Sequence, residues 1–142
     1  MKIITYTLET LLAFLAGTIG FGILSLLLIL ITIGLNDFED YFFLLALPIL
    51  FAPLYEELGK YLSIKIWKIE TFYGFFFGFG WGLLEAIIHY VNREIPASIY
   101  PILIHIATAM ILCYFIKRKK PIFGLITAIV LHVGYNFLIT KI

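Results

Sequence analysis

Residues 72–91 read FYGFFFGFGWGLLEAIIHYV, and this stretch decides the fold. Apart from Glu85 and His89, it carries no carboxyl, imidazole or basic side chain. A helix of about 20 apolar residues crosses the hydrocarbon core of a bilayer. Similar apolar stretches occupy residues 8–35, 41–67, 97–116 and 121–139. We therefore expect an all-α, polytopic helical bundle in a membrane, with about five transmembrane helices.

The composition of the whole chain also indicates a membrane protein. Of its 142 residues, 63% are hydrophobic and 13% are charged, and the mean hydropathy is +1.07. Soluble globular proteins have about 25% charged residues, so that class is excluded. The net charge of +1 leaves no basic face, which argues against nucleic acid as a partner. We expect one transmembrane domain, residues 1–142, in a multi-pass protein of the cell membrane.

The connections between the apolar stretches are short, and short connections place consecutive helices antiparallel. Basic residues concentrate on the cytoplasmic side of membrane proteins. With a cytoplasmic N-terminus, Lys65, Lys68 and the run KRKK at 117–120 all lie on that side, while Arg93 and Lys141 lie outside. We therefore expect an up-down bundle whose N-terminus is cytoplasmic.

Ionisable side chains inside the apolar stretches need an explanation. A charged residue at the centre of a membrane costs about 2.5–3.5 kcal/mol even on the most lenient insertion scale. Such residues pair with one another or mark a functional site. The second to fifth expected helices contain Glu56, Glu57, Lys60, Glu85, His89, His105 and His132.

Small residues share helix faces with these polar groups. Gly74, Gly78, Gly82 and Ala86 recur every four residues, and Glu85 lies on the same face. Such a stripe lets a neighbouring helix approach closely. The same spacing joins Gly124, Ala128, His132 and Asn136 in the last helix, and Pro101, His105 and Ala109 in the fourth. We expect the polar groups to face one another in the outer half of the membrane.

Glutamates and histidines that meet in an apolar setting suit general acid and base catalysis. A glutamate can take a proton from water that attacks a peptide carbonyl, and a histidine with an amide can stabilise the oxyanion. Other hydrolytic sites fit less well, because Asp37 and Asp40 lie in an expected surface loop and the zinc motif H-E-x-x-H is absent. The cofactor stays unknown. The leading interpretation requires no metal, while zinc or manganese stays open.

Four motifs follow one another along the chain: EELGK at 56–60, GFGWGLLE at 78–85, His105, and HVGYN at 132–136. Their order resembles the CAAX protease and bacteriocin-processing superfamily, and most closely its PrsW-like branch. The resemblance covers about residues 50–138. It implies a glutamate-type intramembrane endopeptidase that cleaves a membrane-embedded or juxtamembrane segment of a protein. It also implies that Glu56 activates water and that His132 and Asn136 line the oxyanion site.

Two positions depart from the common superfamily pattern. Lys60 follows the glutamate pair after two residues, as in the PrsW-like branch, whereas arginine after three is common. Trp81 precedes Glu85 where F-x-x-x-H is common. The partner of Glu56 in water activation is therefore open between Glu85 and His105. The candidate catalytic residues are Glu56, Glu57, Glu85, His105, His132 and Asn136, with Lys60 and His89 in supporting roles.

Two other functions stay open from the sequence. Interhelical hydrogen bonds alone explain polar residues in a bundle, which predicts a non-catalytic membrane scaffold of the same superfamily. A file of carboxylates and histidines can also relay protons, which predicts a proton or ion conductor. The expected partners are a membrane protein or peptide substrate and the lipid bilayer. A bundle of this size also leaves room for a homo-oligomer.

Overall fold

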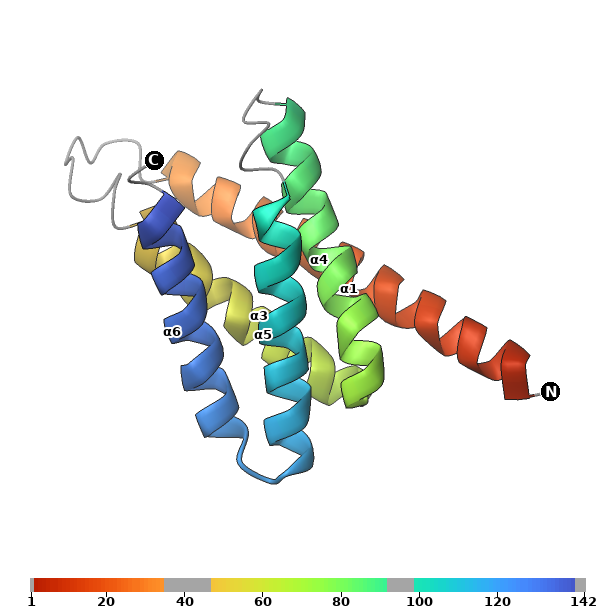
Figure 1. The fold of residues 1–142 in the computed structure, drawn as a ribbon. Coiled ribbons are helices and arrows are strands. Elements are labelled where there is room, and N and C mark those ends of the chain that lie inside the picture. The colour runs from red at the N-terminus through yellow and green to blue at the C-terminus, as the bar shows by residue number, and fades with distance from the viewer. Residues whose placement is uncertain (1, 35–46, 92–98, 140–142) are drawn as a thin grey trace.

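The computed structural model describes residues 2–34, 47–91 and 99–139, and this part of the chain contains helices and no strand. The all-α prediction is therefore confirmed for the described residues. In chain order the elements are α1 (Lys2–Gly34), the π-helix η1 (Leu47–Phe51), α3 (Ala52–Trp67), α4 (Thr71–Val91), α5 (Tyr100–Lys117) and α6 (Pro121–Ile139) (Figure 1).

Within the described residues, four α-helices are long and apolar enough to cross a membrane: α1, α4, α5 and α6. The exception is α3, which has 16 residues and carries Glu56, Glu57 and Lys60. This helix continues directly from the 5 residues of η1. Pro48 and Pro53 lack a backbone N–H, which accounts for the irregular turn at the start of this segment.

The helix bounds differ from the expected ones mainly at the start of the chain. α1 begins at Lys2 and not at residue 8, because polar side chains interrupt an apolar pattern without interrupting a helix. α6 spans 121–139 as predicted. Residues 41–46 of the second expected helix and 97–98 of the fourth lie outside the described part of the chain.

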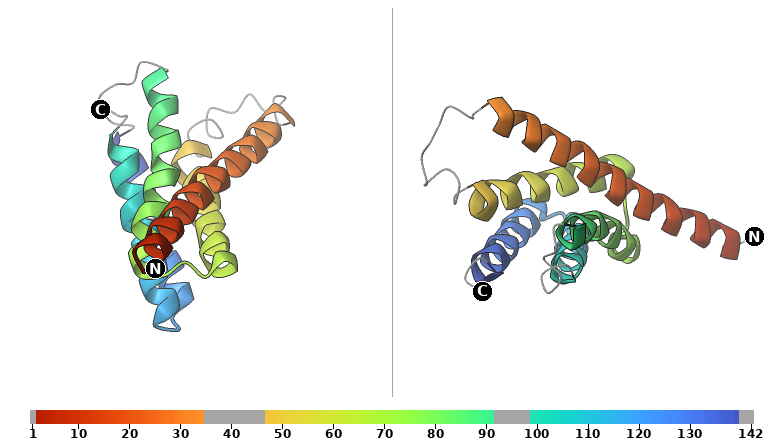
Figure 2. Two further views of the ribbon diagram at one scale, coloured as in Figure 1. Left: turned by 90° about the vertical axis from the view of Figure 1, so that its right-hand side faces the viewer. Right: turned by 90° about the horizontal axis from the view of Figure 1, so that it is seen from above.

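The helices form two layers. α4, α5 and α6 lie side by side and alternate in direction, whereas α1 and α3 cross one side of this group at a strong inclination (Figures 1 and 2). The expected up-down order is therefore present from α3 to α6. In a simple up-down bundle all helix axes are nearly aligned. Here α1 and α3 run obliquely to α4, α5 and α6.

The predicted small-residue stripe of α4 packs against α5. A Cβ atom added at Gly78 would lie 2.5 Å from the carbonyl oxygen of His105, and one added at Gly82 would lie 2.6 Å from Cα of Ile102. These neighbours are backbone atoms that cannot move away. The two helices therefore meet at a distance that glycine alone allows, as the sequence predicted.

A second glycine contact sets the crossing of α1 over α4. A Cβ atom at Gly17 of α1 would lie 2.0 Å from the carbonyl oxygen of Phe77, and one at Gly80 of α4 would lie 2.3 Å from the carbonyl oxygen of Phe14. Glycines on both helices thus let the two backbones touch. α4 is consequently enclosed by α1 on one side and α5 on the other.

Large apolar side chains cover the outward faces of all five described α-helices, as expected for contact with lipid. The interior of the bundle has an apolar part and a polar part. The buried apolar core includes Ala13, Phe21, Ile64, Phe77, Trp81, Ala109, Leu112, Cys113 and Ala128. The buried polar side chains are Glu57, Lys60, His105, Thr108 and His132.

Candidate functional site

Four helices bring the predicted glutamates and histidines together. α3 carries Glu56 and Glu57, α4 carries Glu85, α5 carries His105 and α6 carries His132. The imidazole rings of the two histidines are perpendicular, at 89°, with centroids 5.0 Å apart. We call these five residues the glutamate–histidine cluster. Their predicted meeting inside the bundle is confirmed.

Glu56 faces both histidines. Its Oε2 atom lies 3.7 Å from Nε2 of His105 and 3.9 Å from Nε2 of His132. Both separations exceed the 2.7–3.2 Å or so of a direct hydrogen bond. They suit a contact through one intervening water molecule. The side chain of Glu56 is 12% exposed, so the cluster is nearly enclosed at this point.

His105 stands between two carboxylates. Its Nε2 atom is hydrogen-bonded to Oε2 of Glu85 and also faces Glu56. Because Glu85 and His105 are bonded to each other beside Glu56, the structure keeps both as candidates for its partner in water activation. Glu85 is 18% exposed and His105 is fully buried. Glu56 and Glu85 are therefore the members of the cluster that a molecule from outside meets first.

Glu57 lies behind His132. Its Oε1 atom accepts a hydrogen bond from Nδ1 of His132 at 2.8 Å and another from Nζ of Lys60 at 2.5 Å. Lys60 also donates to Oγ1 of Thr108 at 2.9 Å. All four side chains are at most 1% exposed. This chain of contacts orients the imidazole of His132 so that its Nε2 atom faces Glu56.

The pairing of Lys60 could not be decided from spacing. Lys60 stands four residues after Glu56, but its partner is Glu57, three residues before it. Both spacings bring side chains together on a helix. Glu57 is selected because His132 and Thr108 approach the same side of α3 from two other helices.

Aromatic side chains form the wall of the cluster. The Nζ atom of Lys60 lies 5.7 Å from the centroid of the Trp81 ring. Phe21 of α1 packs edge-on against His105, with ring centroids 6.4 Å apart. Neither Phe21 nor Thr108 was among the predicted site residues. The sequence could have indicated Thr108, because it is a polar residue three positions after His105 and so lies on the same helix face. Nothing in the sequence distinguishes Phe21 from the other phenylalanines, of which the chain has 14 in all.

Two further predicted residues are Asn136 and His89. Asn136 stands one turn after His132 on α6 and is half-buried. His89 is part of α4, four residues after Glu85, but its side chain lies outside the described part of the structure. The supporting role of His89 therefore stays a prediction.

No protein-family model, curated protein or solved structure matches the chain. The resemblance of the four motifs to the CAAX protease superfamily is thus a proposal that depends on the motifs themselves.

Three members of the cluster could hold a metal ion. One oxygen of Glu56 and one ring nitrogen each of His105 and His132 all lie within 4.8 Å of one another. One carboxylate and two imidazoles suit zinc or manganese. Glu57 supplies the outer carboxylate that usually orients a metal-bound histidine. The residues therefore fit a divalent metal, although Nε2 of His105 is also bonded to Glu85.

Proposed function

We propose that this protein is a glutamate-type intramembrane endopeptidase of the cell membrane, with a cytoplasmic N-terminus. Its substrate is a peptide bond in a membrane-embedded or juxtamembrane segment of another protein. The observation that carries the proposal is the position of Glu56, whose Oε2 atom faces the Nε2 atoms of His105 and His132 at 3.7 and 3.9 Å. The resemblance of the four motifs to the PrsW-like branch supports it.

In the proposed reaction Glu56 is the general base. A water molecule between Glu56 and the two histidines gives a proton to Oε2 as its oxygen adds to the peptide carbonyl. The tetrahedral intermediate then collapses, the C–N bond breaks, and the proton moves from Glu56 to the leaving amine. Oε2 of Glu56 has no hydrogen-bond partner among the described residues and is buried, which suits an acceptor that acts on water.

The histidines have different roles in this scheme. The bonded pair of Glu85 and His105 orients the water against Glu56. His132 and Asn136, one turn apart on α6, stabilise the oxyanion. Nδ1 of His132 is bonded to Glu57, so Nε2 is the ring atom that faces the reacting carbonyl.

The free-energy cost of the cluster favours catalysis over a scaffold. Buried charges are expensive, and a buried ion pair is often no more stable than well-packed apolar side chains. Helices can associate without burying charges, as the close glycine contacts of α4 with α1 and α5 show. Six ionisable side chains on four helices, with Lys60 counted, are better explained by chemistry.

The test is cleavage of single-span membrane peptides by the purified protein in lipid. We expect wild type to cleave, Glu56→Gln to lose activity by about a thousandfold or more, and Glu56→Asp to keep part of it. A thermal unfolding midpoint equal to that of wild type shows that each variant is folded. Cleavage by Glu56→Gln at the wild-type rate contradicts the proposed base. An inert wild type whose cluster variants all unfold favours the scaffold.

A further inference from the structure

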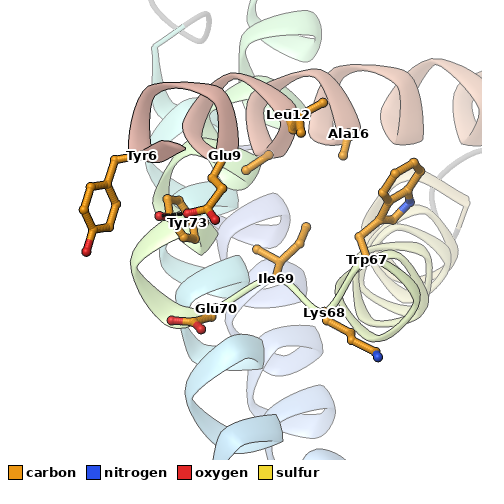
Figure 3. Close-up of a pocket in the computed structure, with 10 residues that line it drawn as sticks. Tyr6, Glu9, Leu12, Ala16, Trp67, Lys68, Ile69, Glu70 and Tyr73 are labelled. Atoms are coloured by element: carbon orange, nitrogen blue, oxygen red, sulfur yellow. Dashed lines mark hydrogen bonds between the residues drawn. The ribbon is translucent and has the colours of Figure 1, made fainter. Parts of the chain in front are cut away.

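A separate pocket lies where α1 crosses the corner between α3 and α4 (Figure 3). It has a volume of about 540 Å³, which is in the range of ligand sites. Tyr73 at its wall precedes Glu85 on α4 by roughly 18 Å of helix rise. The pocket is therefore distinct from the glutamate–histidine cluster. It lies at the ends of α3 and α4, which the expected topology places at the cytoplasmic surface of the membrane.

One end of the pocket is acidic and aromatic. Figure 3 shows Glu9 of α1 and Tyr73 of α4 pointing toward each other, with Tyr6 and Glu70 on the same side. The hydroxyl of Tyr73 donates a hydrogen bond to Oε2 of Glu9, which holds that carboxylate at the pocket wall. Carboxylates and aromatic ring faces together bind ammonium groups.

The other end of the pocket carries a positive charge. Trp67 and Lys68 lie there, on the far side of Ile69 from Glu9 (Figure 3). Lys68 has a φ of 52° and its N–H bonds to the carbonyl of Ile64, so the corner of the chain is fixed at this residue. The surface between the two ends is apolar, formed by Leu12, Ala13, Ala16 and Ile69.

We propose that this pocket binds a zwitterionic phospholipid whose headgroup carries a primary ammonium beyond its phosphate, as in phosphatidylethanolamine. The ammonium binds between Glu9 and Glu70, and the phosphate binds near Lys68. The apolar surface between them contacts the two methylene groups that join the ammonium to the phosphate. Two carboxylates against one lysine disfavour an anionic lipid without an amine. The tyrosines and Trp67 are the side chains that anchor proteins at this depth.

The test is native mass spectrometry of the purified full-length protein with phosphatidylethanolamine, phosphatidylglycerol or phosphatidylcholine added at equal concentrations. We expect phosphatidylethanolamine to bind about tenfold more tightly than phosphatidylglycerol, as one charge-assisted hydrogen bond allows. The double variant Glu9→Gln, Glu70→Gln should lose this preference. Lys68→Gln should weaken all three lipids. Lys119→Gln is the matched control, because Lys119 also has a positive φ, 57°, but lies at the turn between α5 and α6.

The outcomes separate the proposal from its competitors. Equal binding of all three lipids, or a preference that survives Glu9→Gln, Glu70→Gln, overturns it. Tighter binding of phosphatidylglycerol that only Lys68→Gln reduces would indicate an anionic-lipid site and also overturns it. Displacement of the lipid by soluble glycerophosphoethanolamine at equal concentration would assign the site to a free solute. Circular dichroism of each variant checks that it is folded. Because lipid binding is read directly, the result is independent of peptidase activity.

Discussion

Nδ1 of His132 on α6 donates a hydrogen bond to Oε1 of Glu57 on α3 across 2.8 Å. The same oxygen accepts from Lys60, which is also held by Thr108 of α5. Three helices thus contribute to the orientation of one imidazole. The ammonium of Lys60 balances the negative charge of Glu57. The Glu57 carboxylate can therefore stay buried behind His132.

This orientation predicts the effect of removing the hydroxyl of Thr108. Thr108→Val deletes one of the contacts of Lys60 and should lower kcat for peptide cleavage about tenfold, as the loss of an outer contact does at other buried sites. The matched control is Thr127→Val, because the hydroxyl of Thr127 is exposed and bonds only to its own helix, at Phe123. Rescue by Thr108→Ser, together with a changed ¹⁵N spectrum of the His132 ring in Thr108→Val, distinguishes positioning from general stability. Equal kcat in Thr108→Val and Thr127→Val contradicts this role.

The Glu57–Lys60 pair predicts a stability effect that depends on both partners. Glu57→Leu leaves the ammonium of Lys60 buried without its counter-charge and should destabilise the bundle by about 3–5 kcal/mol. The double variant Glu57→Leu, Lys60→Met removes both charges and should recover most of that loss. Unfolding in mixed detergent, followed by circular dichroism, measures both variants. A double variant as unstable as Glu57→Leu would show that the two charges are not coupled.

The contact of α4 with α5 predicts that Gly78 tolerates no side chain. Gly78→Ala places a methyl group 2.5 Å from the backbone oxygen of His105 and should destabilise the protein by about 1–3 kcal/mol through overpacking. Gly134→Ala is the control, because a Cβ atom there has no neighbour within 4 Å among the described residues. The thermal midpoints of the two variants give the comparison. Equal midpoints would argue against the close crossing.

The proposed reaction predicts that cleavage survives metal removal, because Glu56 acts on water directly. Wild type dialysed against a chelator should keep its kcat, and the bound zinc measured by elemental analysis should be well below one ion per chain. Loss of activity that zinc restores would instead assign Glu56, His105 and His132 as metal ligands, since their donor atoms are close enough for that role. His132→Ala should then lower the zinc content.

The order of helices and the identity of the polar cluster could be predicted from the sequence. Apolar stretches long enough for a bilayer identify α1, α4, α5 and α6, because lipid requires each spanning segment to satisfy its own backbone. The stripe of Gly78 and Gly82 identified the face that contacts a neighbour. Glu85 and His105 were expected inside because lipid excludes charge, and both lie there.

The sequence by itself therefore determined which helices form and which faces turn inward, since both depend on the hydropathy of one segment at a time. The tertiary structure alone decided that Lys60 pairs with Glu57 and not with Glu56, that Phe21 packs beside His105, and that Glu9 meets Tyr73 at the pocket between α1, α3 and α4. Each of these contacts depends on the angle and position at which two helices cross. That crossing is set by close packing at glycines such as Gly17 and Gly80 on different helices, and a pattern within one helix does not specify it.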